Sequence, residues 1–219
     1  GVMFIGVLMS NNLCVLCGEV EATTSDHIPP QGIYPKPRDN DIQFHTVPAC
    51  RACNGGTSQE DEEFKVAISL GTSLGRVDDD RLVDWVAKTI AHNKKLGKHV
   101  LENHQRVKLI DHEGKQSSYV QVSFDSKAYD VVAQKIIRGL YWRETGSVLP
   151  KCAKIWLRPT MALDDKTFES FLAILHSKEE KSLNKSTFTY RCDLSTPETT
   201  FWGCTFFGAH TFFAYVEIK

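Results

Sequence analysis

The pattern of apolar and polar positions predicts several helices. The clearest runs from Ser126 to Thr145, where apolar side chains recur every three or four residues and Gly146 supplies a C-terminal stop. Weaker patterns predict a helix over residues 59–71. They also predict one continuous helix that begins behind an acidic cap at residues 78–80 and continues to about residue 99. A further helix is expected after Asp164, a residue suited to capping.

Strands are predicted where polar and apolar residues alternate or where β-branched and aromatic residues gather. A hairpin is expected over residues 107–110 and 119–124, and a strand over residues 153–157. The C-terminal end predicts three strands, over residues 187–193, 199–207 and 211–218. Their many aromatic side chains need cover from water, so we expect this part to pack on the helix of residues 126–145. Together these elements predict an α+β protein.

Two Cys-x-x-Cys pairs lie in the first third of the chain, Cys14 with Cys17 and Cys50 with Cys53. Zinc prefers four thiolates in a tetrahedron, and a Cys-x-x-Cys turn lets two sulfurs reach one ion. Two such pairs separated by a loop are typical of a four-cysteine structural zinc site. The alternative is that the four are disulfides or plain buried thiols; a reducing compartment disfavours the disulfides.

The residues between and after these pairs resemble a known family. The order is Cys-x-x-Cys, then DHIPP at residues 26–30, then a segment ending in VPACRACN at residues 47–54. This order resembles the HNH endonucleases, which carry a ββα-metal finger, and the resemblance covers about the first third of the chain. It implies that the DHIPP segment lies on the first strand of a hairpin and that the second cysteine pair opens a helix.

The same resemblance implies roles for individual residues. His27 is expected to be the general base that activates water, and Asp26 and Asn54 to hold a single catalytic divalent ion, magnesium or manganese. His45 stands where the family usually has its middle Asn, which is a departure, so the expected catalytic set is His27, His45 and Asn54. An Asp before the base and an Asn in the last position resemble the DH…N variant of phage junction resolvases and CRISPR nucleases.

The residue types also suit the chemistry of phosphodiester hydrolysis. An imidazole with an unperturbed pKa of roughly 6.5 takes a proton near neutral pH. A carboxylate and an amide oxygen are hard ligands suited to magnesium or manganese. The competing interpretation makes Asp26-His27 a turn with a capping Asp and a solvated His. Similarly, the acidic residues 60–63 offer an extra metal ligand, although first-turn helix charges are the simpler interpretation.

Charge is uneven along the chain, although its net value is only −1. Residues 81–158 hold 15 Lys and Arg against 7 Asp and Glu, a net +8, whereas residues 1–80 carry a net −7. Lysines and arginines bind phosphate backbones, so the middle segment is a candidate DNA contact surface; a solvated helix face is the alternative. Within the helix of residues 126–145, Lys135, Arg138 and Arg143 fall mostly off the apolar stripe, and we expect them to be available to solvent or phosphate.

These patterns predict a zinc-stapled HNH module over residues 10–71, fused to a helical and antiparallel-sheet domain over residues 72–219 that positions substrate or binds a partner. The expected function is metal-dependent DNA hydrolysis; the alternatives are a non-catalytic zinc-dependent nucleic-acid-binding or adaptor protein, and an RNA-directed nuclease. No apolar run approaches the roughly 20 residues that span a bilayer, so we expect no membrane partner and a cytoplasmic location. A homodimer or a protein activator stays open as a partner.

Overall fold

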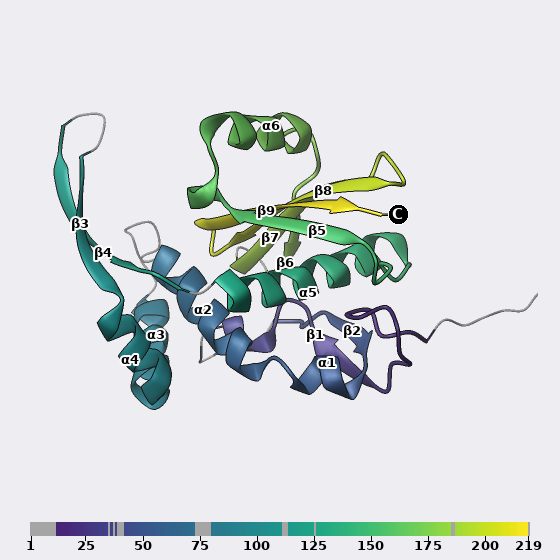
Figure 1. The fold of residues 1–219 in the computed structure, drawn as a ribbon, viewed down its shortest axis with the longest axis horizontal. Coiled ribbons are helices and arrows are strands. Elements are labelled where there is room, and N and C mark those ends of the chain that lie inside the picture. Colours follow the sequence, from purple (N-terminus) through teal and green to yellow (C-terminus); the bar gives the residue numbers. More distant parts are fainter. Residues whose placement is uncertain are drawn as a thin grey trace, which may run out of the picture.

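A computed structural model of the chain describes residues 12–34, 36, 38, 42–72, 80–110, 114–124, 126–184 and 187–218. It contains both helices and antiparallel sheets, so the predicted α+β class is confirmed at that level. The described residues form an N-terminal module of a hairpin and helices, a sheet of five strands, and a second hairpin that follows two helices in the chain and projects from the rest in Figure 1. No helix among the described residues is long and apolar enough to cross a membrane.

The N-terminal module is a two-stranded hairpin followed by helices. Its elements are β1 (Thr24–His27), the short 3₁₀ turn η1 (Gln31–Ile33), β2 (Thr46–Ala49), α1 (Arg51–Gly55) and α2 (Ser58–Thr72). Strands β1 and β2 are antiparallel, with Asp26 opposite Val47 and His27 opposite Thr46. The DHIPP segment therefore begins on the first strand of a hairpin, and the second cysteine pair opens the helix that follows it.

The C-terminal sheet has five antiparallel strands in the order β5-β9-β8-β7-β6. Helix α5 (Ser126–Thr145) lies along one face and α6 (Asp165–Leu175) covers the other. Side chains alternate between the faces; in β8, for example, Trp202, Cys204 and Phe206 point to the face that packs in the core. The strands are β5 (Lys154–Pro159), β6 (Lys181–Leu183), β7 (Phe188–Asp193), β8 (Thr199–Phe206) and β9 (His210–Glu217), with a short 3₁₀ turn η2 (Thr160–Ala162) after β5.

Helix α5 joins the N-terminal module to the sheet. It lies between them in Figure 1, and one hydrophobic cluster contains residues of the module, the helix and the sheet, such as Ile28, Ile136 and Trp202. The contact with the module is close, because a Cβ added at Gly139 would lie 2.6 Å from Cγ1 of Ile28. The predicted boundary at residues 71 and 72 therefore divides a continuous core.

The predicted helix up to residue 99 is two helices, α3 (Asp80–His92) and α4 (Lys94–Glu102), so its prediction as one helix is wrong. The break occurs at Asn93, whose side-chain oxygen accepts a hydrogen bond from the backbone N–H of Leu96 at 3.0 Å and caps α4. Two predicted cap residues, Asp78 and Asp79, lie outside the described residues. Strands β3 (His104–Ile110) and β4 (Gln116–Val122) form the predicted hairpin, which Figure 1 shows projecting from the rest of the molecule.

The prediction for α5 is confirmed in its bounds and wrong for two of its basic residues. Lys135 and Arg138 are buried, with exposed fractions of 7% and 8%. Arg143, closer to the end of the helix, is exposed as expected. Two sides of α5 are covered along its middle, one by the sheet and the other by the N-terminal module, and only a narrow solvated strip that includes Gln134 remains there.

Candidate functional site

The four cysteines of the two pairs come together in one cluster. Their Sγ atoms all lie within 4.8 Å of one another, and a tetrahedron with zinc–sulfur distances of about 2.3 Å requires sulfurs about 3.8 Å apart. Cys14 and Cys17 belong to the loop before β1, Cys50 is the N-cap of α1, and Cys53 lies within α1. The cluster could therefore hold a structural metal ion such as zinc.

Backbone geometry shapes the first of these turns. Gly18 has a φ of +69°, a left-handed conformation that glycine adopts without steric cost, and its N–H donates to the carbonyl of Cys14 at 2.8 Å. A Cβ at Gly18 would also lie only 2.9 Å from the carbonyl oxygen of Leu149. Glycine is thus required both by the turn and by the close approach of the segment after α5.

The pKa values of the cysteine thiols are shifted in both directions. Burial raises the pKa of Cys14 and of Cys53. Burial acts in the same direction on Cys17, but hydrogen bonds from the backbone of Val20 and Glu19 and from the neighbouring thiols lower its pKa to about 7. Burial thus favours the protonated thiol at Cys14 and Cys53, whereas ligation of a divalent cation favours the thiolate form of every cysteine.

Arg138 supplies positive charge beside the cluster. Its guanidinium donates to the carbonyl oxygens of Leu149 at 2.8 Å and Pro150 at 3.3 Å. Burial lowers the pKa of Arg138, and the nearby cysteines act to raise it. Four thiolates around one divalent ion carry a net charge of −2, which a buried guanidinium partly offsets.

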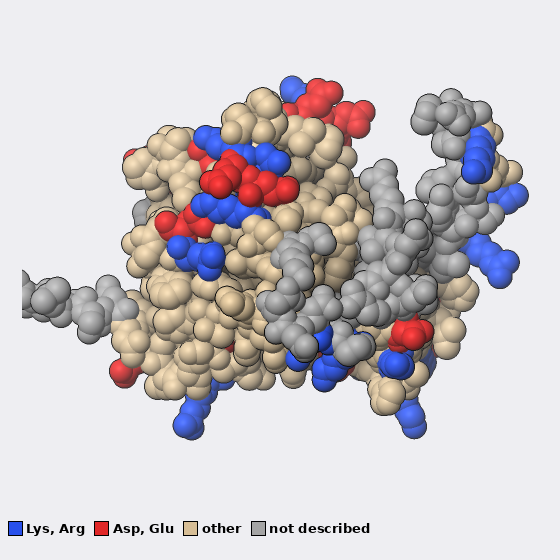
Figure 2. Space-filling model, turned by 180° about the vertical axis from the view of Figure 1, so that it is seen from behind, with Lys and Arg blue, Asp and Glu red and all other residues tan. Residues whose placement is uncertain are grey.

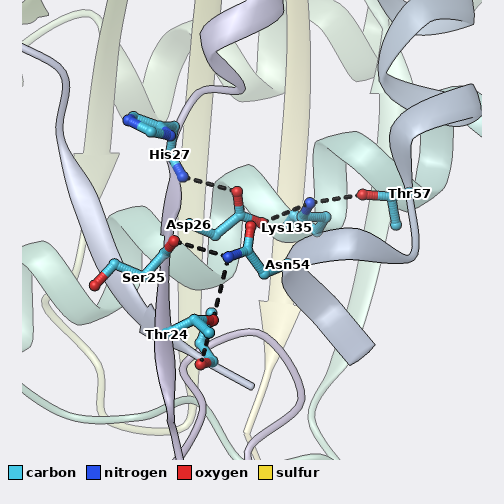
Figure 3. A network of polar contacts seen from close by, with 8 residues as sticks. Thr24, Ser25, Asp26, His27, Asn54, Thr57 and Lys135 are labelled. Carbon is cyan, nitrogen blue, oxygen red and sulfur yellow. Dashed lines mark hydrogen bonds and ion pairs between the residues drawn. The ribbon is translucent and has the colours of Figure 1, made fainter. Parts of the chain in front are cut away.

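Asp26 is the buried member of the Asp-His pair, with an exposed fraction of 8%. Its Oδ1 accepts a hydrogen bond from the backbone N–H of His27 at 2.8 Å. Its Oδ2 lies 2.8 Å from Nζ of Lys135, which reaches the strand from α5 (Figure 3). The carboxylate predicted to bind a catalytic ion is therefore already paired with a buried ammonium.

Asn54 is tied to the same strand. Its amide nitrogen donates to Oγ1 of Thr24 at 3.1 Å and to the carbonyl oxygen of Ser25 at 3.0 Å. Because both partners accept hydrogen bonds, the amide nitrogen faces β1, and Figure 3 shows the amide oxygen turned toward the Asp26 carboxylate. The structure thus brings together two residues that lie 28 positions apart in the sequence.

The His27 ring lies away from this pair. It is half-buried and packs edge-on against Phe44, with ring centroids 5.4 Å apart. Side chains of successive strand residues point to opposite faces, so the ring leaves β1 on the side opposite the Asp26 carboxylate, as Figure 3 shows. His27 is adjacent to the Asp26–Asn54 pair through the backbone but does not converge with it in this arrangement.

His45 contacts the end of α5. Its Nδ1 accepts a hydrogen bond from the Arg143 guanidinium at 3.1 Å, its ring lies 6.4 Å from that of Trp142, and its Nε2 is buried without a hydrogen-bond partner. Burial, followed by the charge of Arg143, lowers the pKa of His45, so the ring is neutral at pH 7. These residues line an open groove of about 770 Å³ that also borders Glu144 and Lys181.

Sequence reasoning missed the roles of Lys135 and Thr57 beside Asp26, and considered Asp61 only as one of four acidic residues that offer an extra metal ligand. Lys135 also donates to Oγ1 of Thr57 at 2.7 Å, and the carboxylate of Asp61 lies near both charges. Burial raises the pKa of Asp61 to about 6, with Asp26 and Glu60 acting in the same direction and Lys135 against them. One signal was available for Lys135: residues 132–140 are otherwise so apolar that α5 has little room for a solvated face.

Comparison with other proteins adds no further assignment. No protein-family model, curated protein or solved structure matches the chain. The interpretation of the site therefore depends on its geometry and chemistry.

The sequence also predicts a basic surface that contacts nucleic acid, formed by residues 81–158. On the face in Figure 2, Lys and Arg interleave with Asp and Glu over the upper left of the molecule, whereas the coloured charged residues of the projecting hairpin at the right are Lys and Arg. Among the described residues, ion pairs of this kind join Lys178 to Asp193, Lys181 to Glu144 and Arg191 to Glu180. The predicted basic segment also loses Lys135 and Arg138 to the interior.

Proposed function

We propose that this protein is a metal-dependent endonuclease that hydrolyses DNA phosphodiester bonds with a zinc-stapled ββα module of the HNH type. The observation that supports it best is the hydrogen bonding of Asn54. The residue directly after the last cysteine is held against the strand of Asp26 and His27, by contacts of 3.1 and 3.0 Å to Thr24 and Ser25. A four-cysteine zinc site would fix this arrangement, because it joins the loop before β1 to the start of α1.

In this proposal, Asp26 and Asn54 hold one magnesium or manganese ion through a carboxylate and an amide oxygen. Such an ion, when bound, stabilises negative charge on the phosphate and on the departing oxygen. His27 takes the proton of the attacking water, and its half-buried ring on the outer side of β1 is open to substrate. His45 binds the phosphate backbone together with Arg143 in the groove at the end of α5, outside the ion site.

A second function is favoured by a different observation. The ammonium of Lys135 already neutralises the Asp26 carboxylate at 2.8 Å, and the His27 ring lies on the other side of the strand. Both features suit a zinc-dependent nucleic-acid-binding or adaptor module in which Asp26 has a structural role. Such a module would bind nucleic acid without cutting it.

Plasmid nicking separates the two functions. Purified protein is incubated with supercoiled DNA and magnesium, manganese or EDTA, beside the variants His27→Ala and His176→Ala. We expect cleavage that depends on the divalent ion and falls at least 100-fold in His27→Ala, because a general base contributes about 10²- to 10⁴-fold. His176 is exposed at the C-terminal end of α6, outside residues 81–158, and serves as the control, with activity expected at the wild-type rate.

Zinc content, measured by elemental analysis before and after EDTA, keeps loss of the structural ion distinct from loss of the catalytic one. Equal cleavage by the wild type and His27→Ala would overturn the catalytic assignment. Absence of cleavage with zinc present at one per chain would favour the binding module. Parallel digests of single- and double-stranded DNA and RNA identify the substrate.

A further inference from the structure

A lysine is buried at the centre of the candidate ion site. Lys135 is only 7% exposed, and its Nζ contacts Oδ2 of Asp26 at 2.8 Å and Oγ1 of Thr57 at 2.7 Å. It comes from α5, more than 100 residues after β1 in the sequence, and enters between β1 and the start of α2 (Figure 3). A buried ammonium of this kind is stable only when it is paired.

The negative charge of Asp26 is already paired with a cation, although its Oδ2 is buried without a hydrogen bond. Oδ1 accepts from the His27 backbone N–H, and Oδ2 faces Lys135. A divalent ion that approaches this carboxylate meets the positive charge of Lys135 in a poorly solvated place, where repulsion between like charges is strong. The ion and the ammonium therefore require the same carboxylate.

A second carboxylate, that of Asp61, interacts with the ammonium of Lys135. Asp61, in the first turn of α2, has a buried Oδ1 without a hydrogen-bond partner, and its charge interacts with that of Lys135. Thr57, which already binds Nζ, lies one helical turn before Asp61, whose N–H donates to the Thr57 carbonyl at 2.8 Å. The ammonium of Lys135 thus interacts with the charges of both carboxylates, and Thr57 links it to the helical turn that carries Asp61.

We propose that Lys135 is the resident counter-cation of Asp26, and that a divalent metal ion binds at Asp26 and Asn54 in competition with it, displacing the ammonium toward Asp61. Lys135 is then a positioning residue, which pairs with Asp26 and holds its side chain in place while no ion is bound. The proposal deepens the proposed function because it concerns the same ion site, but it is a statement about ion binding and needs no cleavage to be tested.

The test is the affinity for manganese, measured by electron paramagnetic resonance of the free ion with the zinc-loaded full-length chain. Removal of the competing charge in Lys135→Met should tighten manganese binding about tenfold, within the 5- to 150-fold that is typical of linked binding equilibria. Lys135→Arg keeps the charge and should stay near the wild type. Lys127→Met, at the exposed start of the same helix, is the matched control and should leave the affinity unchanged.

Asp61→Asn gives a second, opposite result and does not break the Asp26–Lys135 pair. It removes the acceptor of the displaced ammonium, so manganese binding should weaken several-fold. If Lys135→Met fails to fold, as judged by circular dichroism and zinc content, the Asp61 variant decides: an affinity at or above that of the wild type overturns the proposal. A folded Lys135→Met with unchanged or weaker binding also overturns it, since an orienting lysine would support the ion.

The two proposals fail in different ways. Manganese binding that tightens in Lys135→Met without any nicking activity would support the competition and contradict the nuclease. Metal-dependent nicking lost in His27→Ala, together with an unchanged manganese affinity in Lys135→Met, would support the nuclease and contradict the competition. If neither the wild type nor Lys135→Met binds manganese at millimolar concentration, the ion site itself is refuted.

Discussion

Asn54 is defined by the direction of its side-chain amide. The nitrogen faces two acceptors: the carbonyl of Ser25, and Oγ1 of Thr24, whose own hydrogen is donated to the carbonyl of Ala49 at 2.9 Å. Only a donor fits there. An aspartate in this position would be a stronger cation ligand but would direct a carboxylate at two acceptors.

We therefore expect Asn54→Asp to be less stable than Asn54→Ala. The alanine variant loses two hydrogen bonds, at a cost of about 1–2 kcal/mol. The aspartate variant loses the same bonds and adds repulsion between its carboxylate and the two acceptors, at a cost of similar magnitude. Urea unfolding of the zinc-loaded variants in the absence of other divalent ions measures the difference. An aspartate variant as stable as the wild type would show that the amide nitrogen does not hold α1 against β1.

For single residues, the sequence predicts a functional role only where a short local motif contains the residue. The four cysteines and Asn54 are recognisable because a Cys-x-x-Cys turn and the next residue are local features. Lys135 could not be found in the same way. Its partner Asp26 is 109 positions away, and a helical pattern specifies which face is apolar without specifying what else covers the opposite face.

Helix α5 is the element on which both halves of the fold pack, and its start is tied to the sheet by a buried polar contact. The hydroxyl of Tyr129 lies 2.7 Å from Nε2 of His210, the first residue of β9, and both residues are buried. Burial lowers the pKa of His210 to about 4, so the ring is neutral at pH 7 and its nitrogen can accept from the hydroxyl. No other cause contributes to this shift.

This contact predicts a loss of stability in acid. The unfolded chain takes up a proton on His210 near pH 6.5, whereas the folded state does so only near pH 4, so the free energy of unfolding should fall as the pH drops between these values. The full effect corresponds to about 3 kcal/mol, at roughly 1.4 kcal/mol per pKa unit. His210→Gln keeps a polar partner for Tyr129 without titrating, and its unfolding free energy should fall less over this range in urea titrations. An identical acid profile for the two proteins would contradict the assignment.

Element prediction succeeds or fails here according to how local the signal is. Residues 126–145 form the predicted helix because their apolar spacing and Gly146 agree. Residues 80–102 form two helices because the Asn93 side chain caps the second one, and an asparagine within an otherwise helical pattern gives only a weak indication of a break. The three-residue strand β6 forms because it pairs with β7, and a sequence of three residues is too short to show an alternating pattern that would predict it.

At the scale of the whole molecule, the larger of two hydrophobic clusters surrounds α5 and includes residues of both the N-terminal module and the sheet, which determines what the module can do alone. Three residues of α5 support the module from outside it. Lys135 neutralises Asp26, and Gly139 leaves room for the side chain of Ile28. Arg138 lies beside the cysteine cluster. The resemblance to a compact nuclease finger was visible in the sequence. Its dependence on a helix from the C-terminal half was not, because no local pattern encodes contact between distant segments.

A fragment of residues 12–72 is therefore expected not to adopt the native fold even with zinc. It retains all four cysteines, so it should still bind the ion, but it leaves Asp26 without its buried partner and exposes the surface around Ile28, Ile33 and Val47 that packs in the shared core. An unpaired buried charge alone costs about 3–5 kcal/mol, comparable with the entire stability of a domain of this size. Proton NMR should show poor chemical-shift dispersion for the zinc-loaded fragment and good dispersion for the full chain, and zinc should exchange faster from the fragment. A well-dispersed fragment spectrum with wild-type zinc retention would instead show that the cysteine cluster is sufficient to fold the module, and that α5 was added to a finger already stable by itself.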